Sequence, residues 1–489
     1  MRRLLVPSVV AMLAACSTEP LRVPELPAPE QYTTAPVTRT ASAGVPGGEA
    51  QVFTANSDIP AQWWTLFRSP PLDRLVRDAL DASPTLAKAE ARLRQAQEDL
   101  DARADATTFP KVDAKLQANR IDIPAGALGG PGLPIKTPLN LYLATASVSY
   151  TLDLFGATRN ELASLRAAVD YQQFEVQAAR LMLAGNVVTT AIREASLRAQ
   201  VADTQEMIAV QSRQLAIAER MESAGGLAHA DVVSQRADLA RLRASLPDLE
   251  RSLQQARHRL AVYTGRPPGA GDLPEVTLAQ LQIPTELPVS VPSELARQRP
   301  DIRAAEALLQ EAGARVGVAT ANLYPQITLS ANAGSLASSA SKLFESGSGF
   351  YLLGASLTQP IFHGGELQAR RRSAVAAYDQ AAAAYREAVL GGLQNVADTL
   401  RALEADANKL RERADAAAQA RDFEHIAAGR YEAGGVSLYA LLDAQRKLHA
   451  ARLDQTQATA DRYADSAALL QALGGGWWNA PQAQPAGAQ

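Results

Sequence analysis

Side chains that could carry out catalysis or hold a metal are scattered along this chain without a recognisable spacing. The histidines do not fall at the intervals of a metal-ligand motif, and there is no phosphate-binding loop, nucleophile elbow or pair of carboxylates in a turn. The five histidines are His229, His258, His363, His425 and His449. The residues therefore predict no catalytic site, no metal site and no bound cofactor, and we do not expect an enzyme.

The single cysteine, Cys16, has the clearest chemistry in the chain. A basic segment at residues 1–3 and an apolar stretch at residues 4–13 precede it, and small residues lead directly to it. This order resembles a bacterial lipobox, which implies removal of residues 1–15 as a lipoprotein signal peptide and attachment of an N-acyl diglyceride, with palmitate, to Cys16. An ordinary signal peptide or anchor with an incidental cysteine is the alternative. Acyl chains contribute about 0.8 kcal/mol of membrane affinity per buried methylene, so they would anchor the chain without spanning the bilayer.

Composition sets further limits on the class of protein. Residues 16–60 are rich in proline, alanine, threonine and serine without periodicity, which predicts a lipid-anchored extended tether. Ser17 lacks the acidic character that retains lipoproteins at the inner membrane, so we expect the outer membrane. The net charge of −3 gives no reason to expect nucleic acid as a partner. Downstream of the N-terminus no run of about 18 apolar residues occurs, which predicts no membrane-spanning helix.

Most of the remaining chain is a duplicated unit. Tyr171 and Tyr378 each lie 16 residues after a phenylalanine, an offset of 378 − 171 = 207. Phe155 and Phe362 share this offset. Further pairs extend the repeat with small changes of offset: 324 − 109 = 215 upstream, for Phe109-Pro110 with Tyr324-Pro325, and 430 − 220 = 210 downstream, for Arg220 with Arg430 and Gln235 with Gln445. A repeat of this length indicates two copies of one structural unit. We predict a first repeat at residues 61–270, a linker at 271–298, a second repeat at 299–476 and a disordered tail at 477–489.

Each repeat contains a region in which apolar and polar residues alternate. The pattern predicts strands at about residues 110–121 and 140–155 in the first repeat, and at about 325–334 and 350–362 in the second. Alternation over about ten residues is typical of transmembrane β-barrels. A closed barrel needs about eight strands, so four strands per chain would have to be pooled from several chains. A pair of soluble hairpins packed on a core is the alternative.

Long helices separate these strands. Proline-free stretches at residues 157–224 and 365–433 predict helices of roughly 100 Å each, at 1.5 Å per residue. Return helices are predicted at 228–264 and 436–473, and a shorter helix at 300–323. Apolar residues recur every seven positions on two phases of the first long helix: Leu162, Val169, Val176 and Leu183, then Val201, Ile208 and Leu215. Two coiled-coil seams favour a hollow helical wall, although a solid bundle or a dimeric rod stays open.

Glycine pairs are predicted to end both long helices. A glycine at positive φ can stop a helix, after which the return helix begins, so two helical hairpins with exposed tips are expected. The tip residues are Arg220, Gly225, Gly226, Arg430, Tyr431, Gly434 and Gly435. Chain reversal alone would also explain these glycines.

A set of motifs between about residues 60 and 478 resembles the outer-membrane efflux proteins of the TolC type, in particular the lipoprotein branch (NodT-like) that serves resistance-nodulation-division pumps. The motifs are Trp63-Trp64-Thr65-Leu66-Phe67, Leu152-Asp153-Leu154-Phe155-Gly156, Arg299-Pro300-Asp301, Leu323-Tyr324-Pro325, Pro360-Ile361-Phe362, Leu442-Asp443-Ala444-Gln445-Arg446 and Leu473-Gly474-Gly475-Gly476-Trp477. Their occurrence together and in this order is highly specific, whereas one motif alone would not be.

The resemblance implies a mainly α fold with a small β part, assembled as a homotrimer. Each chain would give four strands to a twelve-stranded transmembrane β-barrel and its coiled-coil helices to a periplasmic α-barrel. The tips would dock onto a periplasmic adaptor (membrane fusion) protein and an inner-membrane resistance-nodulation-division transporter. The implied function is the channel of a tripartite efflux system, through which drugs and other toxic small molecules leave the periplasm passively.

The resemblance also places a gate near the start of the last long helix. Carried over by motif, the constriction falls on Tyr439, Asp443 and Arg446. The last two are three residues apart on one helix face, so charge pairs within or between protomers are sterically reasonable, and a threefold ring of them would face a narrow pore. An ordinary solvated ion pair is the alternative for these two residues, and Tyr439 replaces the aliphatic side chain common in relatives.

Two other functions compete with an efflux channel. A lipid-anchored periplasmic coiled-coil scaffold or adaptor would share the helices and the anchor. It would have no reason to carry apolar alternation on the strands, which favours the channel. An outer-membrane conduit for protein or polysaccharide export would share every feature of the sequence, and transport assays would be needed to separate it from small-molecule efflux.

Overall fold

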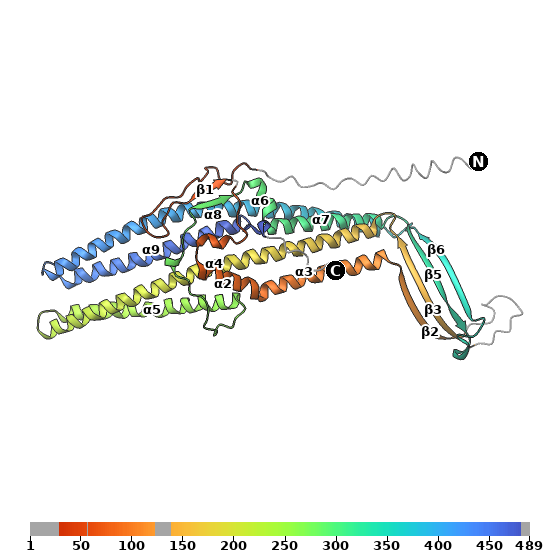
Figure 1. Cartoon of the computed structure of the whole chain (residues 1–489), viewed down its shortest axis with the longest axis horizontal. Helices are drawn as coiled ribbons and strands as arrows, with labels where there is room; N and C mark the ends of the chain where they lie inside the picture. Colours follow the sequence, from red (N-terminus) through yellow and green to blue (C-terminus); the bar gives the residue numbers. More distant parts are fainter. Residues whose placement is uncertain (1–28, 56, 123–137, 481–489) are drawn as a thin grey trace. The chain divides into compact units, whose positions relative to one another are not determined.

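The structure is a computed structural model that describes residues 29–55, 57–122 and 138–480 of the 489 (Figure 1). Cys16 and residues 481–489 lie outside the described residues. The chain forms two compact units. The sheet unit contains Arg94–Tyr171 and Ala305–Arg386, and the helical unit contains Pro27–Leu93, Gln172–Ala304 and Glu387–Gln489. Within the described ranges, four helices, among them the two longest, run through both units.

The sheet unit holds an antiparallel sheet of four strands in the order β2-β3-β5-β6. The strands are β2 (Lys111–Ile121), β3 (Leu139–Leu152), β5 (Gln326–Ala337) and β6 (Gly349–Thr358). Each repeat contributes one hairpin, and the hairpins meet where β3 pairs with β5, for example at Leu152 opposite Ile327. The outer strands β2 and β6 therefore form the two edges of the sheet.

The registers place most of the apolar residues of the four strands on one face, although some, such as Leu143 and Leu352, lie on the other. Residues paired across an antiparallel ladder share a face, and Val112 pairs with Val148, which pairs with Ala331, which pairs with Leu353. Lysine, serine, threonine and asparagine residues occupy most of the opposite face. The predicted alternation is thus present as a two-faced sheet.

Two strand ends differ from the prediction. Strand β6 stops at Thr358 and does not reach residue 362, because Pro360 has no backbone N–H with which to continue a ladder. Strand β3 ends at Leu152, because the Asp153 carboxylate turns to accept hydrogen bonds from the backbone N–H groups of Thr158 and Arg159 at the start of the next helix. Both corrections concern the same end of the sheet.

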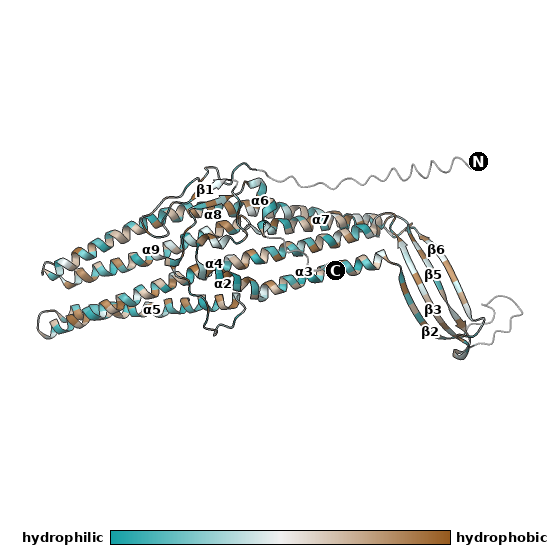
Figure 2. Ribbon diagram, viewed as in Figure 1, coloured by the Kyte–Doolittle hydropathy of each residue, from teal (hydrophilic) through white to brown (hydrophobic). Residues whose placement is uncertain are grey.

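Two helical hairpins are prominent in the helical unit. Helix α4 (Ala157–Ser223) returns as α5 (His229–Tyr263), and α8 (Glu366–Glu432) returns as α9 (Leu438–Ala472) (Figure 1). The remaining α-helices are α2 (Pro70–Ala82), α3 (Pro84–Thr108), α6 (Pro292–Gln298) and α7 (Pro300–Ala321). Hydrophilic and hydrophobic residues are interspersed along the long helices (Figure 2). Within the described residues, no helix combines the length and the apolar character needed to cross a membrane.

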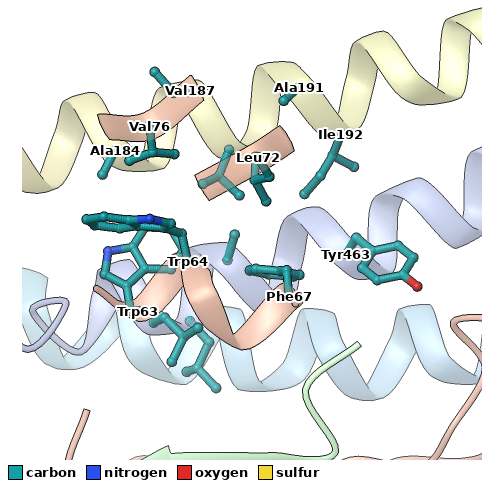
Figure 3. Packing of buried hydrophobic residues seen from close by; sticks show 14 of the residues in the cluster. Trp63, Trp64, Phe67, Leu72, Val76, Ala184, Val187, Ala191, Ile192 and Tyr463 are labelled. Carbon is teal, nitrogen blue, oxygen red and sulfur yellow. The ribbon is translucent and has the colours of Figure 1, made fainter. Parts of the chain in front are cut away.

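The main hydrophobic core belongs to the helical unit. The short helix η1 (Trp63–Phe67) inserts Trp63 and Phe67 among apolar side chains of α2, α4 and α9 (Figure 3). The Phe67 ring lies 6.2 Å from the Tyr463 ring, whose hydroxyl donates a 2.9 Å hydrogen bond to the Leu281 carbonyl. Gly475 has φ +66°, and a Cβ there would lie 2.3 Å from Leu181 Cδ1, so the close approach requires glycine.

The predicted tether is wrong for its second half, which packs onto the helical unit. Strand β1 (Val52–Ala55) pairs in parallel with β4 (Glu286–Val289), and Gln51 is buried. Arg462 of α9 is fully buried and donates hydrogen bonds to the carbonyl oxygens of Gly47 and Glu49. Composition gave no sign of this docking, because the acceptors are main-chain carbonyls that every residue carries.

The predicted linker and the predicted disordered tail also contain structure. The linker at residues 271–298 holds both β4 and α6. The tail begins with the short helix η5 (Trp477–Asn479), where the Trp477 indole donates a 2.7 Å hydrogen bond to the Gln298 carbonyl. An indole buries its ring only where its N–H finds an acceptor, and α6 supplies that acceptor.

Candidate functional site

The three predicted gate residues lie in the first turns of α9, just beyond the glycines that end α8. The side chain of Ser437 caps this helix by accepting a hydrogen bond from the Ala440 N–H at 3.3 Å. With the start of α9 fixed in this way, Tyr439, Asp443 and Arg446 follow at helical spacing. Tyr439 is 65% exposed, so its ring is available to groups outside the hairpin.

Asp443 carries the main electrostatic feature of this segment. Its carboxylate binds Arg446 at 2.5 Å and Lys447 at 2.8 Å. The hydrogen bond from Lys447, followed by that from Arg446, lowers the pKa of Asp443 below its usual range, despite an opposing effect of desolvation. The carboxylate is therefore ionised at neutral pH. The sequence indicated Arg446 as its partner but missed Lys447, although the i,i+4 spacing from Asp443 could have found it.

A cavity of about 180 Å³ lies beside these residues and joins three helices of the helical unit. All three predicted gate residues line it. Helix α5 adds a second i,i+3 ion pair to the lining, with Arg241 bound to Asp238 at 2.8 Å. The rest of the lining is Met207, Gln211, Gln235, Leu242, Leu442 and His449. The wall thus contains two Asp–Arg pairs on facing helices, of which the sequence indicated only one.

Contacts with two neighbouring helices hold this part of α9. His449 is nearly buried, and its ring nitrogen lies 2.7 Å from the Asp203 carboxylate of α4. On the side of α8, the Lys447 ammonium lies 5.4 Å above the Phe423 ring, within range of a cation–π interaction. Lys447 therefore links the Asp443 carboxylate to α8. Within the described residues, no group of three or more His, Cys, Asp or Glu could hold a metal ion.

The predicted tips have the same backbone structure. Gly225 and Gly434 have φ values of +77° and +72°. The N–H of Gly226 bonds to the Met221 carbonyl, and the N–H of Gly435 bonds to the Arg430 carbonyl, as in a Schellman motif. A Cβ built on Gly225 or Gly434 would meet no atom within 4 Å, so both turns present an open backbone surface.

The two tips are joined by a small apolar cluster. Its buried members are Ala218, Val232, Ala427, Leu438, Leu441 and Ala444. Tyr431, predicted as a docking residue, packs against this cluster while partly exposed. Arg220 donates a 3.2 Å hydrogen bond from Nε to the carbonyl of Ala216 in its own helix. At the tips, Tyr431 thus contributes to packing, whereas Gly225 and Gly434 are exposed on the surface.

Comparisons with known proteins establish the family. A family model described as outer membrane efflux protein matches residues 75–266 and 291–475. The chain belongs to the outer membrane efflux protein family. The two matched segments fall on either side of the region that contains β4.

Several named outer-membrane proteins align over most of the chain. The pyoverdine export outer membrane protein OpmQ of Pseudomonas putida is 32% identical over 438 residues, covering 88% of this chain and 92% of the relative. The antibiotic efflux pump outer membrane protein ArpC, also from Pseudomonas putida, is 30% identical and covers 96% of this chain and 94% of its own. The probable outer membrane lipoprotein SilC of Salmonella typhimurium is 26% identical, with coverage of 97% and 99%.

Solved structures of efflux channels share the fold. The outer-membrane channel OprN superposes with a TM-score of 0.79 at 30% identity, covering 90% of this chain and 97% of its own. VceC from Vibrio cholerae gives a TM-score of 0.77 at 25% identity, with coverage of 86% and 100%. The fold is thus the mainly helical one of TolC-like channels, with a small β part. The protein is an outer-membrane efflux channel, a class that is not enzymatic.

Proposed function

We propose that this chain forms a homotrimeric conduit, gated at the start of α9, through which small molecules leave the periplasm. A periplasmic adaptor protein and an inner-membrane resistance-nodulation-division transporter would complete the system, with the hairpin tips as the adaptor's docking surface. The observation that carries the gate is the cavity in which two Asp–Arg pairs, on α5 and α9, lie beside the exposed Tyr439.

The sheet edges support assembly with further copies of the chain. All residues of the edge strand β6 are exposed, and they include Tyr351 at 81% and Leu353 at 73%. The other edge, β2, exposes Val112 at 70% and Leu116 at 76%. An apolar edge strand with unpaired backbone groups is an aggregation hazard unless another strand covers it. Pairing β6 of one copy with β2 of the next would remove every edge and give a twelve-stranded barrel in a trimer.

The charges at the cavity support an opening mechanism based on helix movement. Asp443 is ionised and is held by two cations of its own helix, so its negative charge has nearby partners while α9 stays in place. Exposed ion pairs of this kind contribute only about 0–1 kcal/mol each, so a docked partner at the tips has enough binding energy to rearrange them. Binding of a partner at the tips would therefore be able to shift the gate from closed to open in the assembled pump.

Single-channel conductance in planar bilayers tests the gate. We expect the double variant Asp443→Ala/Arg446→Ala to conduct severalfold more than the wild type, because the charged groups proposed to ring the narrow part of the pore are gone. The matched control is Asp248→Ala/Arg251→Ala, which removes another i,i+3 pair, on α5, that does not line the cavity. Unchanged conductance in the first variant, or an equal rise in the control, would remove these residues from the gate.

The cargo is proposed to be small organic molecules. The activities for which two relatives are named, pyoverdine export for OpmQ and antibiotic efflux for ArpC, support this class. Drug susceptibility of a channel-deficient strain complemented with this gene provides the test. Restored resistance without restored protein secretion supports small-molecule efflux. Restored secretion of a protein or polysaccharide alone would favour the other conduit, and a protein that neither inserts nor conducts would favour the scaffold.

Acylation of Cys16 is proposed as an additional anchor. A lipoprotein relative, SilC, supports this modification. Replacing Cys16 by serine should abolish the mass of the acyl groups but leave most of the protein in the membrane fraction, because the exposed apolar strands provide a separate contact with lipid. Complete release from the membrane would mean that the lipid is the sole anchor.

A further inference from the structure

An aromatic stack marks the point where the two repeats meet in the sheet unit. Phe155 follows the end of β3, and Tyr324 precedes the start of β5, the strand that pairs with β3. The two rings are stacked, with centroids 4.9 Å apart and planes inclined by 11°. Nearby on the same seam, Thr151 and Thr328 are register partners whose hydroxyl oxygens lie 3.2 Å apart.

The sequence repeat supplies a counterpart for each ring. Phe362 corresponds to Phe155, and Phe109 corresponds to Tyr324. Phe362 follows the end of β6, and Phe109 precedes the start of β2, so these two rings flank the outer strands of the sheet. Their exposed fractions are 86% and 63%. Within the part of the chain that the structure describes, neither ring is stacked on another aromatic ring.

We propose that Phe362 of one protomer stacks on Phe109 of the partner subunit, so that an aromatic pair closes each seam between protomers. This rests on the trimer of the proposed function. The partner is a second copy of this chain, because only another copy offers a β2 edge preceded by Phe109. In the trimer, six strand pairings would join one repeat to another: three β3–β5 pairings within chains and three β6–β2 pairings between chains. Each of them would then carry one stacked pair of rings.

The register of the strands agrees with this pairing. In the repeat, Thr151 of β3 corresponds to Thr358 of β6, and Thr328 of β5 corresponds to Asp113 of β2. If β6 pairs with the β2 strand of the next copy in the register of β3 and β5, Thr358 lies opposite Asp113 of the partner subunit. It also puts Leu357 opposite Ala114 of the partner subunit. Leu357 and Ala114 both belong to the apolar face of the sheet, as the registers within the chain define it. A one-residue error would have put an apolar residue against a polar face, so the agreement is a check on the alignment.

A stacked contact between protomers would explain why aromatic residues occupy these two exposed positions. Offset-stacked rings attract each other beyond the burial of their area, and pairing removes two large apolar surfaces from water at the ends of the edge strands. The rings also lie at the ends of the strands, where a stacked pair would fix the register of the ladder that follows. The intrachain pair at Phe155 does this within the chain.

Cysteine cross-linking of the full-length trimer tests the contact. The variant Phe109→Cys/Phe362→Cys is treated with a short bis-maleimide, and the variant Phe155→Cys/Tyr324→Cys serves as the geometric control. We expect a ladder of covalent dimer and trimer from the first pair. From the second pair we expect only a cross-link within one chain, with no gain in mass on a denaturing gel. Each single cysteine variant should give no ladder, which also controls for cross-linking through Cys16.

The outcomes separate the contact from the trimer on which it rests. A trimer by mass in detergent that gives no ladder would overturn the stack and leave the proposed function in place. A 109–362 cross-link within one chain would also overturn the stack. A protein that is never trimeric would overturn both. If the cysteines disturb assembly, Phe109→Ala and Phe362→Ala provide a second test.

Each alanine variant should lower the temperature at which the trimer dissociates, and the double variant should dissociate no earlier than the worse single variant, because both remove the same pair. Additive losses would mean that each ring contacts something else, such as lipid, and would overturn the proposal. Variants Phe155→Ala and Tyr324→Ala, assayed alongside, should show the same non-additivity for the stack that the structure contains.

Discussion

The two helical hairpins share a backbone plan but differ in how their return helices are braced. In the α4–α5 hairpin, Arg236 of α5 reaches across to Glu219 of α4 at 2.7 Å. Its repeat counterpart, Arg446 of α9, binds Asp443 of its own helix, because the position that matches Glu219 is Gly429. Both repeats thus carry the arginine, but it binds the neighbouring helix in the first repeat and its own helix in the second.

The ion pairs that join α9 to α8 in the described residues lie farther from the tip. They connect Lys409 to Asp461 at 2.6 Å and Arg413 to Asp454 at 2.6 Å. The first turns of α9 are therefore tied to α8 by weaker contacts, while α5 is tied to α4 by charge near its tip. The difference indicates that α8–α9 is the hairpin whose start can move, and α4–α5 the one that stays in place.

The largest expected effect on channel opening comes from adding to α8 an acidic partner for Arg446. A Cβ at Gly429 meets no atom within 4 Å, so Gly429→Glu fits and offers Arg446 the partner that Arg236 has. One exposed ion pair contributes up to about 1 kcal/mol, so we expect single-channel openings to become about threefold to fivefold rarer. Gly429→Gln is the control of equal size without charge. If both variants open as often as the wild type, the bracing difference does not govern opening.

An effect on stability is expected from Asp465, a half-buried acidic residue whose repeat counterpart in α5 is Gln255. Burial, followed by the neighbouring Asp406 and Asp461 carboxylates, raises the pKa of Asp465 to about 7, although Lys409 opposes the shift. The folded state therefore keeps a proton that the unfolded state loses from about pH 4 upward. This group favours folding most at low pH, and its contribution is lost as the pH rises through about 7.

Replacing Asp465 by asparagine should remove this dependence. The variant should gain about 2 kcal/mol of stability over the wild type at pH 8 and less than half of that at pH 5, after allowance for partial solvent screening. Thermal unfolding at both pH values provides the measurement, with Asp248→Asn on the exposed face of α5 as the control. A gain that is the same at both pH values would assign the effect to packing and not to ionisation.

The smallest effect is expected from removing the ion pair that joins α5 to α4. Arg236→Ala deletes an exposed pair and should cost about 0.5 kcal/mol, visible as faster hydrogen exchange of amides near the start of α5. Arg446→Ala should leave exchange between α8 and α9 nearly unchanged, because its ion pair does not cross between helices. Equal acceleration in both hairpins would contradict the difference in bracing.

The sequence predicted the elements better than the contacts between them. Periodicity and proline spacing placed α4, α9 and the four strands within a few residues, since these signals are local. The Asp238–Arg241 pair was visible as an i,i+3 spacing, yet nothing in the sequence said that it lies across a cavity from Asp443. That placement depends on the rotation of α5 against α9, which side-chain packing over many turns determines. Motif resemblance alone found Tyr439.

The docked N-terminal segment shows the limit of composition as a guide. Its residues lack helical or strand periodicity, so they were predicted to be extended and free. Their binding depends on Arg462, a residue on α9 that is 415 positions away from Gly47 in the sequence. Such a contact leaves no trace near either partner, and only the three-dimensional structure reveals it.

That same distance constrains the order of events during biosynthesis. A contact between residues this far apart in the sequence closes a long loop, and such non-local contacts form slowly. Synthesis proceeds from the N-terminus, so the segment around Gly47 is made long before the arginine that will hold it. The contact with Arg462 can thus form only after α9 has been made, and a chain truncated before α9 would leave its N-terminal segment without the buried cation that binds it.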